Sequence, residues 1–230
     1  MGPLAGMKIV ELAGIGPVPF CSTLLSDMGA QVIRVDRTAP SGLGISGKNP
    51  AFDVLGRGRQ SISVDLKNPD GVETVLRLVE SADALVEGFR PGVIDRLGFG
   101  HERLMALNPG LIYASISGFG QTGPLRGKPA MDPVLQAFTG FMMDNKGHDG
   151  VPHRVNTIVN DMSTALYAFQ ALSPALYAKR DDGRGRFIDV SLMRGAANLS
   201  AIRIMAASQG NLQNGPRTAP SGVFPTSDGW

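Results

Sequence analysis

The fold is decided near the N-terminus by the stretch Met7-Lys-Ile-Val-Glu-Leu-Ala-Gly-Ile-Gly-Pro-Val-Pro-Phe-Cys-Ser-Thr-Leu-Leu-Ser-Asp-Met-Gly-Ala-Gln-Val-Ile-Arg-Val-Asp36. Its first part, Met7–Leu12, is a short apolar run that predicts a strand, and Phe20–Met28 has the apolar spacing of a helix. Gly29 suits the position just after a helix, and Gln31–Asp36 predicts a second strand. A strand, a helix and a strand in such close succession are typical of a right-handed parallel unit.

The same alternation continues along the chain. We expect strands at Ser61–Asp65, Ala84–Glu87, Leu111–Ile116 and Arg186–Val190, and helices at Pro69–Val79, Glu102–Leu107, 132–142, 161–179 and Leu192–Gln209. This order predicts an α/β fold with a mostly parallel sheet. The stretch 38–60 is rich in Gly, Ser and Pro, and a loop of such length in a compact domain is usually functional or mobile. A second glycine-rich stretch lies at 117–130.

The composition excludes several classes of protein. The 230 residues include 30 Gly and 16 Pro, too many turn formers for a coiled coil or a helical bundle, while 43% hydrophobic residues exclude a disordered chain. The 22 Lys and Arg oppose 20 Asp and Glu without a basic run, so we expect no nucleic-acid partner. Cys21 is the single cysteine, which fits a reducing compartment, and we expect it to pack as a small buried hydrophobe. The sequence has neither a signal peptide nor a membrane-spanning run, so a cytoplasmic protein with no membrane partner is predicted.

One large domain is expected over 1–210, and 211–230 then reads as a connection that leaves it. The last residues, Gly222–Trp230, have the pattern of a strand, a turn and the start of a returning strand. We therefore expect the chain to be a fragment of a longer protein.

Glycines after the first predicted strand suggest a nucleotide-like ligand. Gly14-Ile-Gly16 opens a helix, and Asp36 ends the next strand 20 residues after Gly16. The dinucleotide fingerprint is incomplete because Pro19 occupies the place of its third glycine, which disfavours classical NAD binding. A tight turn, or a site for another nucleotide-like ligand with Arg37 on a phosphate, remain the two interpretations.

Two aspartates precede predicted helices and have two interpretations each. Asp161 is either a helix N-cap or a carboxylate that the positive end of a helix keeps ionised for attack as a nucleophile or base. Asp132 is either a cap or a second carboxylate of the same site. No metal site is predicted, because His148 and His153 lie in a stretch with the composition of an exposed loop.

Several longer segments resemble the family III CoA transferases, the CaiB/BaiF group, which includes the alpha-methylacyl-CoA racemases. The matching segments follow the family order and are 3–12, 25–37, 64–67, 86–98, 108–124 and 183–192. The resemblance implies a Rossmann-like large domain followed by a small domain that this chain lacks, and two subunits interlocked as rings. It also implies an acyl-CoA and a carboxylic acid as substrates, with coenzyme A as a substrate moiety and no prosthetic group.

By position, the resemblance assigns the catalytic aspartate to Asp161, which would form an aspartyl anhydride and then an aspartyl-CoA thioester. Residues expected to contact CoA or its thioester come from the predicted turns and strand ends: Ile15, Gly16, Pro17, Arg37, Val64, Lys67, Gly88, Phe89, Arg96, Met131 and Asp132. Arg37, Lys67 and Arg96 are the cations expected to bind phosphates.

Two residues depart from the family pattern. Gly88 stands where the transferases usually have Asn, so one hydrogen bond to the ligand would be absent. Met131 stands where the racemases have the histidine base, and a thioether cannot transfer a proton. Segments up to Lys67 look closer to the racemases and 128–178 looks closer to the transferases, so we favour CoA transfer. The alternatives are 2-methylacyl-CoA epimerisation and a non-catalytic CoA-binding fragment.

Overall fold

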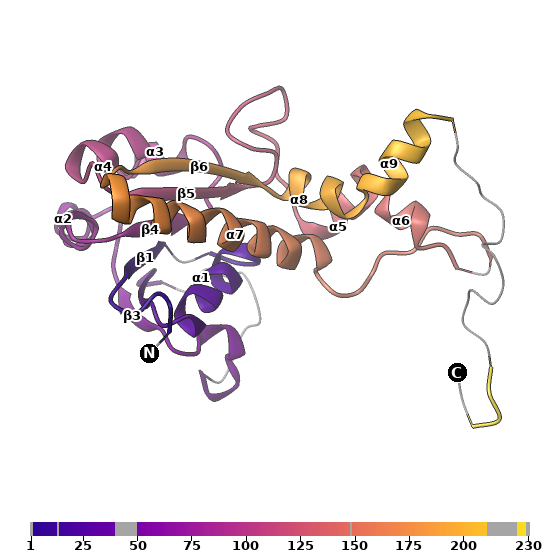
Figure 1. Cartoon of the computed structure of the whole chain (residues 1–230), viewed down its shortest axis with the longest axis horizontal. Coiled ribbons are helices and arrows are strands. Elements are labelled where there is room, and N and C mark those ends of the chain that lie inside the picture. The colour runs from indigo at the N-terminus through magenta and orange to yellow at the C-terminus, as the bar shows by residue number, and fades with distance from the viewer. Residues whose placement is uncertain (1, 13, 40–49, 148, 211–224, 229–230) are drawn as a thin grey trace.

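A computed structural model describes residues 2–12, 14–39, 50–147, 149–210 and 225–228. Its centre is a six-stranded sheet with the order β3-β2-β1-β4-β5-β6 (Figure 1). The strands are β1 (Lys8–Leu12), β2 (Gln31–Asp36), β3 (Gln60–Ser63), β4 (Ala84–Glu87), β5 (Ile112–Ser117) and β6 (Arg186–Ser191). Each neighbouring pair is parallel, which confirms the predicted α/β fold.

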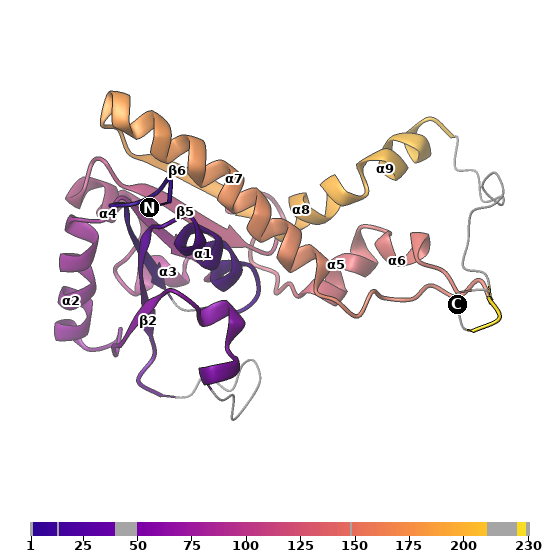
Figure 2. The same ribbon diagram turned by 60° about the horizontal axis from the view of Figure 1, so that its bottom comes forward.

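Helices cover both faces of the sheet. On one face α1 (Pro17–Asp27) and α7 (Val159–Asp182) lie side by side (Figures 1 and 2). The other face carries α2 (Pro69–Glu80), α3 (Val93–Arg96) and α4 (His101–Leu107). Asn68 begins α2 because its side chain accepts a hydrogen bond from the Asp70 amide at 2.9 Å.

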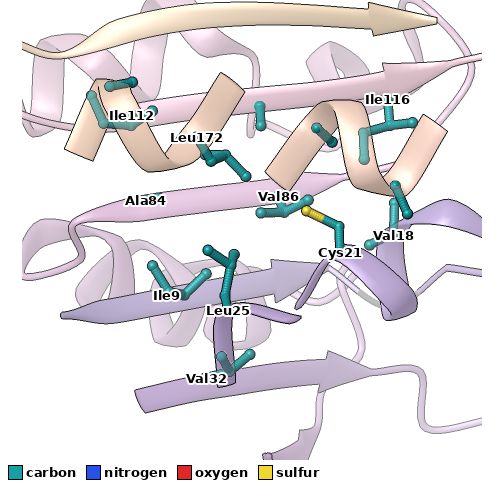
Figure 3. Close-up of a cluster of buried hydrophobic side chains, with 14 of the residues drawn as sticks. Ile9, Val18, Cys21, Leu25, Val32, Ala84, Val86, Ile112, Ile116 and Leu172 are labelled. Atoms are coloured by element: carbon teal, nitrogen blue, oxygen red, sulfur yellow. The ribbon is translucent and has the colours of Figure 1, made fainter. Parts of the chain in front are cut away.

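Two hydrophobic cores result, one on each face of the sheet. Figure 3 shows the core beneath α1 and α7, where Cys21 packs with residues such as Val86 and Leu172. Cys21 is fully buried, as predicted, and burial raises the pKa of its thiol, so it is a packing residue here. Both cores are built from alternate residues of the same strands, which is why these strands read as continuous apolar runs.

Helices beyond the carboxyl ends of the strands differ from the prediction (Figure 1). The expected helix at 132–142 is two helices, α5 (Asp132–Phe138) and α6 (Phe141–Asp144), since Gly140 breaks it at φ 77°. The expected helix from Leu192 is also divided, into α8 (Leu192–Leu199) and α9 (Ala201–Ser208), at Ser200. The 38–60 stretch includes two short 3-10 helices, η1 (Pro50–Phe52) and η2 (Val54–Gly56).

Some predictions concern residues outside the described ranges. His148, most of the connection at 211–230 and most of the expected terminal hairpin are among them. The domain division at residue 210 therefore stays a prediction.

Candidate active site

The turn after β1 meets the first turn of α7. Gly16 adopts φ 69°, and a Cβ atom built on it would lie 2.5 Å from Asp161 Oδ2. Only glycine suits this position, because it needs both a left-handed backbone and room for the carboxylate. The structure thus brings the predicted turn Ile15–Pro17 against the predicted catalytic aspartate.

The carboxylate of Asp132 caps α7 from another part of the chain. Its Oδ2 accepts hydrogen bonds from the backbone amides of Asn160 at 2.7 Å and Asp161 at 3.3 Å, and its Oδ1 accepts one from Gln136 Nε2 at 2.5 Å. Ile158 occupies the N-cap position of α7, so the interpretation of Asp161 as an N-cap is wrong. Capping is done by Asp132, which is 3% exposed, and the Asp161 side chain is left free for another role.

The Asp161 carboxyl group pairs with no group in the part of the chain that the structure describes. Among the described residues, its side chain accepts no hydrogen bond and forms no ion pair. Burial, and secondarily the charge of Asp132, raise its pKa to about 7, although the start of a helix favours a carboxylate. The expectation of a fully ionised group at neutral pH is therefore corrected to one that titrates there.

This aspartate lies beside the point where the strand order reverses. β1 and β4 are neighbours, and the chain proceeds from them toward opposite edges of the sheet. Ligands of such sheets bind outside the carboxyl ends of the strands at this crevice. Gly88 follows β4, and a Cβ atom there would lie 2.7 Å from Val18 Cγ2 of α1. The two predicted turns, at Gly16 and Gly88, thus flank the switch point.

A cavity of about 500 Å³ opens next to it, at the ends of β2, β3 and β4. Four of the predicted contact residues line it together: Arg37, Val64, Lys67 and Phe89. Arg37 and Lys67 are exposed and form no ion pair within the described residues, so both cations are free to meet an anion. An apolar wall of Val35, Val64, Leu66, Val93 and Leu97 completes the cavity.

Two predicted residues are placed differently. Arg96 is exposed on α3, and Val93 and Leu97 line the cavity in that region in its place. Met131 directly precedes the cap Asp132, and its side chain is 64% exposed. Its thioether offers neither an acid nor a base beside Asp161.

Sequence reasoning missed two buried glutamates. Glu87 ends β4, and burial raises its pKa to about 7. Glu11 on β1 pairs with Arg59, whose side chain is 2% exposed, and burial raises the pKa of Glu11 as well. An acidic residue inside an apolar strand was the available signal, because charged groups are rarely buried without a partner or a function.

Within the described part of the chain, no three His, Cys, Asp or Glu side chains are arranged to hold a metal ion. None of the helices described there has the length and apolar character needed to cross a membrane.

Comparisons with known proteins give a consistent assignment. The CoA-transferase family III matches residues 4–230. The acetyl-CoA:oxalate CoA-transferase of Acetobacter aceti is 38% identical over 99% of this chain and 62% of its own, and the alpha-methylacyl-CoA racemase of Mus musculus is 38% identical over 86% and 50%. The crystal structure of a CaiB/BaiF family protein from Brucella suis superposes with a TM-score of 0.87 at 34% identity, over 99% of this chain and 65% of that one.

The chain spans less than two thirds of the length of these relatives. The match nevertheless includes the turns, the cavity and the aspartate described above. The chain belongs to CoA-transferase family III.

Proposed function

We propose that the protein transfers coenzyme A from an acyl-CoA to a carboxylic acid, with Asp161 as the nucleophile. The observation that carries the proposal is the Asp161 carboxyl, which pairs with none of the residues that the structure describes and faces the Gly16 turn at the switch point. A raised pKa makes the ionised form more basic and hence more nucleophilic, while that form is still populated near pH 7.

In the proposed reaction, an Asp161 oxygen attacks the thioester carbonyl of the donor and expels CoA thiolate, which leaves an aspartyl anhydride. The thiolate attacks the Asp161 carbonyl, forms an aspartyl-CoA thioester and releases the donor acid with one former Asp161 oxygen. The acceptor carboxylate then attacks this thioester and expels the thiolate, giving a second anhydride. Finally the thiolate attacks the acceptor acyl carbonyl, which yields the new acyl-CoA and returns Asp161. No proton or electron is gained or lost in the cycle.

The nucleotide part of CoA is proposed to occupy the 500 Å³ cavity. Arg37 and Lys67 would bind its phosphates, and Val64 and Phe89 would contact its apolar and ring surfaces. Ile15, Gly16 and Pro17 would carry the pantetheine arm past Gly88 to Asp161. Arg96 is proposed as an outer phosphate contact, reached as its long side chain swings from α3.

Small dicarboxylic acids are the substrate class that the relatives suggest. The relatives include an acetyl-CoA:oxalate CoA-transferase and a succinyl-CoA:D-citramalate CoA-transferase from Chloroflexus aurantiacus, the latter 35% identical. We propose that the acceptor comes from this class.

An interlocked homodimer is proposed for the protein. Apolar side chains of α9 support it: Ile202 is 77% exposed and Met205 is 56% exposed. A second subunit would bury such a surface.

Epimerisation is the second candidate, because a racemase is among the relatives. Met131 weighs against epimerisation. Inversion of a stereocentre needs two acid–base groups: Asp161 can supply one, and the thioether of Met131 cannot supply the second. Two incubations in deuterium oxide, one with succinyl-CoA and oxalate and one with a 2-methylacyl-CoA, separate the candidates. Transfer predicts oxalyl-CoA in the first incubation and no deuterium in the 2-methylacyl-CoA of the second. Epimerisation predicts deuterium uptake by a 2-methylacyl-CoA without change of carrier. Asp161→Ala should abolish the observed reaction, and a protein that binds CoA but performs neither reaction would be a non-catalytic CoA-binding module.

A further inference from the structure

Three polar residues form a row across the carboxyl ends of adjacent strands. Glu87 of β4 is in register with Ser115 of β5, which is in register with Asp189 of β6. In-register residues of parallel neighbours point to the same face of the sheet, so these side chains are neighbours. Glu87 is 1% exposed and Ser115 is 2% exposed, so these two residues lie inside the protein, and Asp189 is half-buried.

Hydrogen bonds join the row to the turn that follows β4. Glu87 Oε2 accepts from the Phe89 amide at 2.7 Å, and the Ser115 hydroxyl binds the Glu87 carboxyl. Gln121 connects Ser115 with Asp189. Its side-chain Nε2 donates to Ser115 Oγ at 2.8 Å, and its backbone amide donates to Asp189 Oδ2 at 3.1 Å. A continuous polar chain therefore runs from β6 to Phe89.

Phe89, the last residue of this hydrogen-bonded series, belongs to the candidate active site. Phe89 lines the 500 Å³ cavity, and Gly88 packs against Val18 at the start of α1. A side chain at position 88 has no room, because its Cβ atom would lie 2.7 Å from Val18 Cγ2. Residue 88 therefore has no side chain that could orient the turn toward the ligand. The orientation of the turn has to be fixed by other residues.

We propose that Glu87 is a positioning residue for acyl-CoA, which holds the Gly88–Phe89 turn in its binding orientation through the Phe89 amide and the Ser115–Gln121 hydrogen bonds. The inference rests on the proposed function, because it takes the cavity to be the CoA site. Burying a carboxyl group is costly unless its oxygens are hydrogen-bonded. In return, the hydrogen-bonded carboxyl group keeps the turn ordered before the ligand binds. Ligand binding then loses less conformational entropy.

Calorimetric titration of the protein with CoA itself tests the inference without requiring turnover. Glu87→Ala removes the acceptor of the Phe89 amide, and we expect CoA to bind about tenfold more weakly or worse. Glu87→Gln keeps an acceptor for that amide and a donor for the Ser115 hydroxyl, so its affinity should stay within about threefold of the native value.

Asn108→Ala is the matched control. Asn108 also makes side-chain hydrogen bonds to backbone, to the carbonyls of Val79 and Ala82 at 2.9 Å; these bonds are half-buried and lie at the opposite end of the sheet. This variant should lose stability and keep native CoA affinity. A merely structural role of Glu87 predicts the same behaviour for Glu87→Ala.

Native affinity in Glu87→Ala, or an equal loss in Glu87→Gln and Glu87→Ala, would overturn the inference. If Glu87→Ala does not fold, Ser115→Ala decides: weaker binding supports the row, and unchanged binding contradicts it. Failure of the native protein to bind CoA at all would instead refute the proposed function, so the two failures are distinguishable.

Discussion

Replacing Asp161 with Asn should stabilise the protein above neutral pH. The pKa of Asp161 is raised from an ordinary 3.8 to about 7, so the folded state holds its proton to higher pH than the unfolded chain. The stability that this proton gives is complete below pH 3.8, falls as the pH rises, and is lost above about 7. Asn is isosteric with the protonated acid and does not titrate, so the variant escapes this loss.

The difference between the two pKa values corresponds to about 4 kcal/mol above pH 7. Two effects reduce the benefit. The carboxylate is only partly buried, and Asn gives up a favourable charge at the start of α7, which is worth about 0.3–1 kcal/mol. We expect Asp161→Asn to gain about 2 kcal/mol over the native protein as the pH rises from 5 to 8.

Denaturant unfolding at pH 5 and pH 8 measures this gain as the change in the free-energy difference between the two proteins. Glu87 and Glu11 titrate in both proteins, and their contributions cancel in the difference. A gap that is equal at both pH values, or that shrinks as the pH rises, would refute the reasoning about Asp161.

Three further predictions concern Asp132, Gly16 and the Glu11–Arg59 pair. Asp132→Asn keeps an oxygen to cap α7 but removes a negative charge beside Asp161. The midpoint of the pH profile of kcat should therefore fall below about 7, and it should stay above 3.8 because Asp161 remains partly buried. An unmoved midpoint would contradict an effect of the Asp132 charge on the pKa of Asp161. Gly16→Ala should abolish transfer, since its Cβ would meet Asp161, whereas Gly123→Ala, also at positive φ but with open space around it, should lose about 1–2 kcal/mol of stability and keep its activity. Arg59→Met should destabilise the protein by about 3–5 kcal/mol, because it leaves the buried Glu11 carboxylate without its ion-pair partner. Adding Glu11→Leu should recover much of this stability in denaturant unfolding. No recovery would mean that Arg59 contributes packing and not charge.

The sheet was predictable because its signals are local. Strands such as β1 and β4 are short apolar runs, and the helix between β1 and β2 has its own apolar spacing, so Met7–Asp36 alone indicates a parallel unit. The breaks at Gly140 and Ser200 escaped prediction because single residues interrupt otherwise helical spacing. Where a helix ends depends on backbone conformation and contacts that periodicity does not report.

The candidate site was predictable only in part. Asp161 and the turn at Gly16 come together through packing of α1 against α7, which joins residues far apart in the sequence. Local sequence could not decide between cap and nucleophile for Asp161, because the true cap, Asp132, comes from another helix. The Glu87 row has the same character: its members align only when β4, β5 and β6 take their register.

Oxygen transfer to Asp161 tests the central claim most directly. The protein, in excess over succinyl-CoA so that each site turns over at most once, would react with oxalate labelled with oxygen-18 in its carboxylates. The peptide that contains Asp161 would then be weighed by mass spectrometry. An anhydride cycle leaves one acceptor oxygen on Asp161, so this peptide should gain about 2 Da while a peptide that carries Asp132 gains nothing. Formation of oxalyl-CoA with an unlabelled Asp161 would contradict its role as the nucleophile.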